Sequence, residues 1–216
     1  DTEAVEQLQS QQALVKHLLS VESTTAGLTE LLYSDEIAIQ LHKMGFKAVM
    51  TEGAKHILSW KSPNYVYSSS AAPKLKVLLR NTTLSDELAF HFSDSTWHNF
   101  PMDAEKFATT LATLPEEEQV VNIWVGAETF GIRQSATSGI FDFLKALPYY
   151  AMEQEMGFMT PSEVAKKFAA SDAVVVPYPL TWAGEGKDLS TYNGNDLQQE
   201  AVQKLYAVAE RVHLCK

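Results

Sequence analysis

The order of apolar and polar positions predicts short buried strands that alternate with amphipathic helices. Mostly apolar runs of the kind found in strands buried on both faces occupy 46–50, 76–79, 120–125 and 173–176, and a further strand is expected around 28–32. Apolar residues at helical spacing instead predict helices at 3–22, after Ser34, around Phe107 and Leu111, at 138–147 and at about 196–212. The pattern is that of βα units, without hairpins.

Several of these helices carry recognisable start and stop signals. Ser34 precedes two acidic residues that suit the first turn of a helix, and Gly45 supplies its end. The run Thr160-Pro161-Ser162-Glu163 combines a capping box with a proline at the first helical position, which makes it the sharpest boundary in the chain. The segment 62–73, rich in serine and containing two prolines, is predicted to be a flexible loop.

Five strands alternating with helices are typical of a parallel α/β sheet or barrel, but five strands are too few to close a barrel. Two arrangements remain open on this pattern. The sheet is open and doubly wound, or the chain is part of a barrel whose other strands lie upstream or on another chain. We expect residues 1–216 to form a single α/β domain with a helical C-terminal part from about residue 196.

Composition narrows the classes of partner. A net charge of −10 and a pI near 5.0, without any basic run, argue against binding to nucleic acid or to a membrane surface. Cys215 is the single cysteine, so an internal disulfide is not expected, and we predict a cytoplasmic protein, although a removed organelle presequence would leave no trace. The histidines are scattered, and we predict neither a metal nor a cofactor.

Carboxylates follow several predicted strands, and aromatic residues occur in the connecting loops. The acidic candidates are Glu30, Glu52, Asp86 and Glu128, and the aromatic candidates for stacking on sugar rings are Trp60, Trp97, Trp182 and Tyr192. In a parallel sheet these carboxylates would converge at the carboxyl ends of the strands, as in an enzyme that acts on carbohydrate. Each has a simpler explanation: Asp86 suits a helical first turn, and any single aromatic residue is typically a packing residue.

Several blocks of the sequence resemble a known family. They are TELLYSDEIA (29–38), MGFKAVMTEGAKHILSWKSPNYVY, LLRNTTLSDELAFHFSDSTW, ETFGIRQSATSGIFDFLKALP and TWAGEGKDLSTYNGNDLQQEAVQKLY. In order and spacing they are similar to the α-amylase-like branch of glycoside hydrolase family 57. The resemblance extends over nearly the whole chain.

The resemblance implies an incomplete (β/α)7 barrel followed by helices, of which this chain would be the second half, with the first strands missing. It also implies action on α-1,4-glucans with retention of configuration. Glu30 matches the family's nucleophile, whereas Gly126 stands at the position of the acid/base aspartate. Glu128, two residues further on, is a weak substitute. The loss of general acid/base catalysis removes a factor of about 10² to 10⁴ in rate.

Other departures from the family pattern agree with this loss. Ile132 and Arg133 stand where the branch usually has an acidic residue and a histidine, and Gly184 follows Trp182-Ala183 where an acid is expected. The opening blocks of the family, including its His-Gln-Pro motif, are absent.

Three interpretations therefore compete. We favour a noncatalytic or impaired α-amylase-like protein that binds α-glucan or serves as a subunit of a larger assembly, with another chain or an upstream segment completing the barrel. The second is an active retaining α-glucan hydrolase or transglycosylase with Glu30 as nucleophile. The third is a structural protein in which neither the groove nor Glu30 matters.

Overall fold

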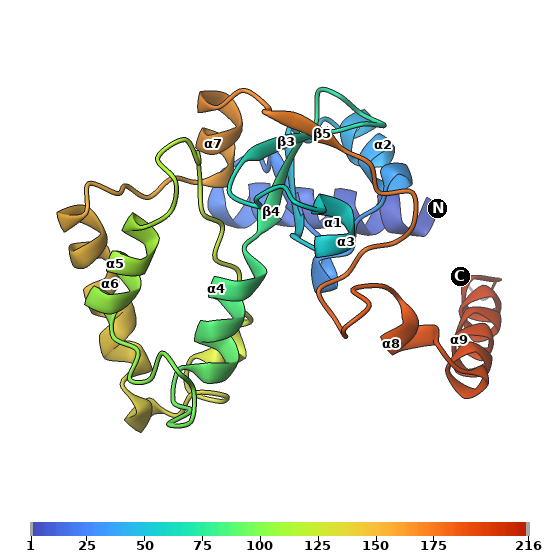
Figure 1. Ribbon diagram of the computed structural model, residues 1–216. Coiled ribbons are helices and arrows are strands. Elements are labelled where there is room, and N and C mark those ends of the chain that lie inside the picture. The colour runs from blue at the N-terminus through green and yellow to red at the C-terminus, as the bar shows by residue number, and fades with distance from the viewer. Residues whose placement is uncertain (1, 215–216) are drawn as a thin grey trace.

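The fold is built on a five-stranded sheet with the strand order β1-β2-β4-β3-β5. The computed structural model describes residues 2–214 (Figure 1). The strands are β1 (Thr25–Gly27), β2 (Ala48–Glu52), β3 (Val66–Ser69), β4 (Lys76–Arg80) and β5 (Asp172–Val174). The pairs β1–β2, β2–β4 and β3–β5 are parallel, whereas β3–β4 is antiparallel. The predicted α/β class with a mostly parallel sheet is therefore confirmed.

Helices surround this sheet and extend away from it. They are α1 (Thr2–Leu19), α2 (Asp35–Lys43), α3 (Lys55–Leu58), α4 (Thr82–Asp86), α5 (Ala104–Ala112), α6 (Ile140–Glu153), α7 (Pro161–Lys167), α8 (Ser190–Asn193) and α9 (Asp196–Leu214). Short helical turns are η1 (Thr29–Leu31), the π-helical η2 (Glu87–His91), η3 (Ala127–Thr129) and η4 (Ala136–Ser138). Figure 1 shows α4, α5 and α6 on one side of the sheet and α9 set apart on the other. Cys215 lies outside the described residues.

The start and stop signals act as predicted. The Ser34 hydroxyl accepts a hydrogen bond from the Ile37 backbone N–H at 3.3 Å, and Gly45, with φ of +91°, follows the end of α2. At α7, Thr160 and Glu163 form the reciprocal hydrogen bonds of the capping box. These boundaries depend on contacts within a few residues, which explains why the sequence located them.

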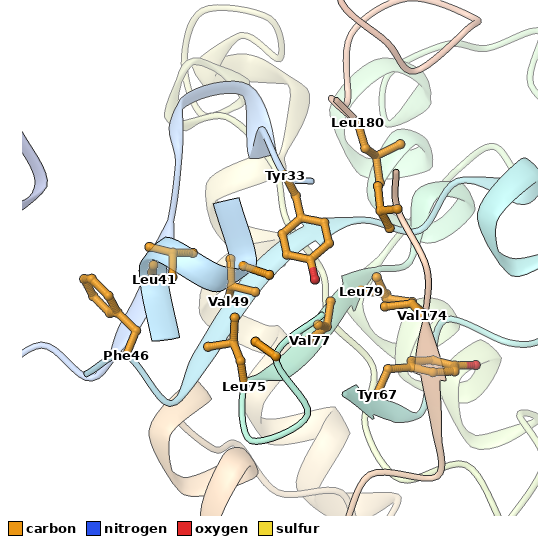
Figure 2. Close-up of a cluster of buried hydrophobic side chains, with 14 of the residues drawn as sticks. Tyr33, Leu41, Phe46, Val49, Tyr67, Leu75, Val77, Leu79, Val174 and Leu180 are labelled. Carbon is orange, nitrogen blue, oxygen red and sulfur yellow. The ribbon is translucent and has the colours of Figure 1, made fainter. Parts of the chain in front are cut away.

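The main core lies on one face of the sheet, between the strands and α2 (Figure 2). Its largest fully buried members include Tyr33, Leu41, Val49, Leu75 and Leu180. A separate cluster joins α4, α5 and α6 and includes Phe92, Phe107 and Phe143. The opposite face of the sheet packs against Val164 of α7.

In the part of the chain that the structure describes, no helix combines the length and apolar character that crossing a membrane requires.

The segment predicted as a flexible loop, 62–73, contains β3. Val66, Tyr67 and Ser69 are buried, and β3 pairs with both β4 and β5. Serines normally indicate loops, but here Ser69 lies inside the fold and its hydroxyl accepts a hydrogen bond from the Ala72 backbone N–H at 3.2 Å. The prediction of βα units without hairpins was therefore wrong at β3–β4.

The segment 120–125 was predicted as a strand, but it is not one of the five. It makes a single parallel bridge, between Asn122 and Arg80. The β3 strand begins opposite Leu78, so only the last two residues of β4, Leu79 and Arg80, are left unpaired by β3 on that side. An extended segment that meets only the end of its neighbour cannot form a ladder.

The strand expected around 28–32 ends earlier, at Gly27. Glu30 and Leu31 have φ values of +59° and +54°. An extended strand requires negative φ, so the chain leaves the sheet before these residues. The leucines of this segment gave the apolar pattern of a strand, although they lie in a tight turn that packs against the protein interior.

A buried arginine joins the strand ends to the neighbouring segments. The Arg80 guanidinium donates hydrogen bonds to Glu52 at 3.0 Å, to Asp86 at 2.5 Å and to the Trp124 carbonyl at 2.8 Å. The side chains of Arg80 and Glu52 are 2% and 0% exposed. The Glu52 carboxylate also accepts hydrogen bonds from the Gly53 N–H and the Thr82 hydroxyl. Every polar atom that these contacts involve is satisfied, as a buried ion pair requires.

We expect Arg80→Ala to lower the free energy of unfolding by about 3–5 kcal/mol, because it removes the cation that donates a hydrogen bond to the buried Glu52 carboxylate and leaves the more distant Lys187 ammonium, at 4.0 Å. Chemical denaturation followed by circular dichroism measures the change. Lys61→Ala is the control, since it removes the more exposed Lys61–Asp172 pair and should cost about 0–1 kcal/mol. Equal losses for the two variants would show that the Arg80 network does not stabilise the fold.

Candidate functional site

A pocket of about 360 Å³ lies at the carboxyl ends of β1 and β4. Glu30, Gly126, Glu128 and Trp182 line it together, although they come from three distant parts of the sequence. Carboxyl ends of parallel strands are the usual place for sites in α/β folds. The structure therefore brings four of the predicted site residues to one place.

Glu30 follows β1 in a conformation that non-glycine residues rarely adopt. Two consecutive left-handed residues, Glu30 and Leu31, each cost about 1–3 kcal/mol and persist only where other contacts hold them. Here the Glu30 carbonyl accepts a hydrogen bond from the Trp182 backbone N–H at 3.0 Å, and the Leu31 carbonyl accepts one from the Thr51 hydroxyl at 2.8 Å. The backbone is thus fixed, with Glu30 lining the pocket.

The Glu30 carboxylate is held by two aromatic residues that lie about 150 positions later in the chain. Its Oε2 atom accepts hydrogen bonds from the Trp182 indole N–H and from the Tyr192 hydroxyl, the latter at 2.8 Å. Burial, reinforced by Glu30, raises the pKa of Tyr192 to about 12, so the phenol stays protonated and donates. Lys187 donates to the Trp182 carbonyl at 2.9 Å and steadies this segment.

Glu128 occupies the space beside Gly126. A Cβ atom placed on Gly126 would lie 2.3 Å from each oxygen of the Glu128 carboxylate. Gly126 has φ of −64° and ψ of 145°, which any residue can adopt, so its backbone does not require glycine. The missing side chain is what allows Glu128 to fold back over residue 126.

Arg133 pairs with Glu128 at the same wall of the pocket. Its guanidinium donates to Glu128 Oε1 at 3.2 Å, and both side chains are partly exposed. A hydrogen bond from the backbone N–H of Glu128 itself, followed by the contact with Arg133, lowers the pKa of the Glu128 carboxyl. This carboxylate therefore favours its ionised form, whereas a general acid must hold a proton.

The other predicted site residues do not line this pocket: they are Trp60, Trp97, Asp86, Glu52 and Tyr192, of which Tyr192 donates a hydrogen bond to Glu30. Trp60 is 87% exposed and lies elsewhere on the surface. Trp97 stacks on His91 with ring centroids 3.9 Å apart. Asp86 accepts the hydrogen bond from Arg80, so its carboxylate takes part in the buried network.

Sequence reasoning missed three residues of the pocket wall: Arg80, Phe90 and Trp124. Trp124 belongs to a segment that we interpreted only as a strand, and Phe90 lies in a stretch without any apparent chemical motif. Arg80 could have been predicted from the sequence, because it is a cation at the end of an apolar strand.

Gly184 stands where the resemblance leads us to expect an acid. It has φ of +64°, a conformation that favours glycine.

Among residues 2–214, no group of three or more histidine, cysteine, aspartate or glutamate side chains is arranged to hold a metal ion. The two carboxylates that line the pocket, Glu30 and Glu128, already have hydrogen-bond donors bound to them. Carboxylates, a neutral phenol and flat aromatic faces are the side chains that bind and cleave sugars.

Two glutamates and aromatic rings line a pocket at the strand ends of a mostly parallel α/β sheet, an arrangement that suits a sugar ligand. Comparison with known proteins agrees. Residues 1–177 match the model of Glycosyl hydrolase family 57, and the chain belongs to this family.

Similarity to individual proteins agrees with this family. A protein of Methanocaldococcus jannaschii described as "Putative alpha-amylase" is 35% identical over 208 residues, which cover 95% of this chain and 44% of that protein. The chain thus spans less than half the length of this relative. The crystal structure of a 4-α-glucanotransferase from Thermococcus litoralis is similar in fold, with a TM-score of 0.61 and 17% identity, over 80% of this chain and 27% of that one.

We expect Arg133→Gln to raise the pKa of Glu128, because the variant removes the cation that favours the carboxylate. The pKa should stay below its ordinary value, since the hydrogen bond from the Glu128 backbone N–H, the larger cause, remains. Titration followed by carbon-13 NMR of the glutamate carboxyls measures the shift. Arg211→Gln, which changes an exposed arginine of α9, is the control. An unchanged Glu128 pKa would contradict the pairing.

Proposed function

We propose that this chain provides an α-glucan-binding pocket in which glycosidase chemistry is lost or strongly impaired. Glu30 is suited to the nucleophile's place: it lies at the end of β1, lines the pocket, and its carboxylate is oriented by Trp182 and Tyr192. Family membership and the similarity to an α-amylase-like protein and to a glucanotransferase favour α-glucan as the sugar.

The observation that carries the proposal is the arrangement around Gly126. Retaining hydrolysis needs a second group that protonates the leaving oxygen and later activates water. Gly126 has no side chain, and the carboxylate that lies over it, Glu128, is paired with Arg133. An ionised carboxylate beside an arginine is a poor proton donor, so cleavage of an unactivated glycosidic bond should be slow.

The open edge of the sheet supports a role within a larger assembly. Among residues 2–214, β1 is an edge strand that pairs with β2 alone. An unpaired edge exposes backbone N–H and C=O groups that another strand can satisfy. We therefore propose that a further segment or another chain covers β1 and completes a barrel, as the resemblance implies.

We expect isothermal titration to detect binding of maltoheptaose by the purified chain. In parallel, the release of reducing sugar from soluble starch should be no faster than with Glu30→Gln, because the acid is missing already. Glu36→Gln, on the outer surface of α2, controls for the loss of a glutamate as such. Fast sugar release that disappears in Glu30→Gln but not in Glu36→Gln would refute the proposal, whereas slow release with the same dependence on Glu30 would identify an impaired enzyme.

One observation favours the second candidate, an active retaining hydrolase or transglycosylase. The Glu128 carboxylate occupies the space that a side chain at 126 would take, within the same pocket as Glu30. In that case sugar release would be abolished by Glu128→Gln as well as by Glu30→Gln. Loss in Glu30→Gln alone would show that Glu128 is not the substitute acid.

A further inference from the structure

Phe90 is a large apolar side chain that lies on the pocket wall and not in the core. It is 41% exposed, whereas Leu88, Ala89 and Phe92 around it are buried. Leu88 and Phe92 pack in the cluster of α4, α5 and α6, to which Phe90 does not belong. Burial of Phe90 therefore does not explain its position.

The local backbone accounts for this position. Phe90 lies in the π-helical turn η2, which continues α4. A π-helical turn carries more residues than an α-helical one and rotates the following side chains; such turns are frequent at functional sites. Here the turn leaves Phe90 beside the pocket while Phe92 returns to the core.

Phe90 faces a second ring whose orientation is fixed. Its ring and that of Trp182 are within 9° of parallel, with centroids 6.4 Å apart. Trp182 is held by its indole N–H and its backbone N–H, both of which donate to Glu30. Two parallel aromatic faces thus line one pocket next to a carboxylate.

We propose that Phe90, together with Trp182, binds a glucosyl ring of an α-glucan by stacking. The C–H groups on one face of a pyranose pack on an aromatic ring, while the hydroxyls around its edge need polar partners such as Glu30 and Tyr192. Phe90 has no polar atom, so it contributes stacking alone. This inference rests on the proposed glucan binding, and it identifies Phe90 as a residue that contributes to the affinity for glucan.

Arg133 offers a competing explanation for Phe90. The carbon at the centre of the Arg133 guanidinium lies 4.8 Å from the centroid of the Phe90 ring, as in a cation–π contact. If supporting Arg133 were the only role of Phe90, loss of the ring would leave glucan affinity unchanged. The two roles are therefore separable by binding measurements.

Isothermal titration of maltoheptaose into the wild type and into Phe90→Leu tests the inference. Leucine keeps an apolar side chain on the pocket wall but removes the flat face, and we expect affinity to fall about three- to tenfold. Phe90→Tyr should bind like the wild type. Phe158→Ala, at an exposed phenylalanine outside the pocket, should also leave affinity unchanged. Thermal unfolding verifies that every variant is folded.

The outcomes separate the two proposals. Binding by the wild type with equal affinity in Phe90→Leu would overturn the stacking role and leave the proposed glucan binding intact. Absence of binding by the wild type would refute the proposed function, and the stacking role with it. Weakening in both Phe90→Leu and Phe158→Ala would also overturn the inference, because the effect would not be specific to the pocket.

Discussion

The buried guanidinium of Arg80 is the contact on which the arrangement of the pocket depends. It connects β4 to β2 through Glu52, to α4 through Asp86, and to the segment 120–125 through the Trp124 carbonyl. A planar group with five N–H donors can satisfy several acceptors in fixed directions, which a lysine cannot do. This side chain thus holds the strand ends to the segment that precedes Gly126, together with hydrogen bonds from Asn122 to the Leu79 carbonyl and from the Trp124 N–H to the Ser85 hydroxyl.

Around this support, the pocket is assembled from segments that are far apart in sequence. Glu30 leaves β1 in a left-handed conformation, and the segment around Trp182 returns to bind both its backbone and its carboxylate. The strain at Glu30 is maintained by tertiary hydrogen bonds and cannot arise from local preference. Strained residues of this kind cluster at binding and active sites, where the surrounding structure holds them in place.

The positions of Glu30 and Gly126 in the pocket differ in the groups that they offer for catalysis. At the position that the resemblance gives to the nucleophile, Glu30 is a carboxylate with two bound donors. At the position that it gives to the acid, Gly126 has no side chain and the Glu128 carboxylate lies over it. The hydrogen bond from its own backbone N–H and then the contact with Arg133 lower the pKa of Glu128, which favours the ionised carboxylate. A binding surface can survive this change because stacking and hydrogen bonding to sugar need no proton transfer.

The sequence by itself determined the α/β class, the helix boundaries at Ser34, Gly45 and Thr160, and the candidate pair Glu30 and Gly126. These follow from periodicity, from caps that act over three or four residues, and from blocks that resemble one family. Only the tertiary structure decided that 66–69 pairs within the sheet while 120–125 does not, because strand pairing depends on which edges are free. It also decided that Glu128 lies over Gly126 and that Phe90 joins the pocket, since such contacts arise between segments whose approach no local pattern encodes.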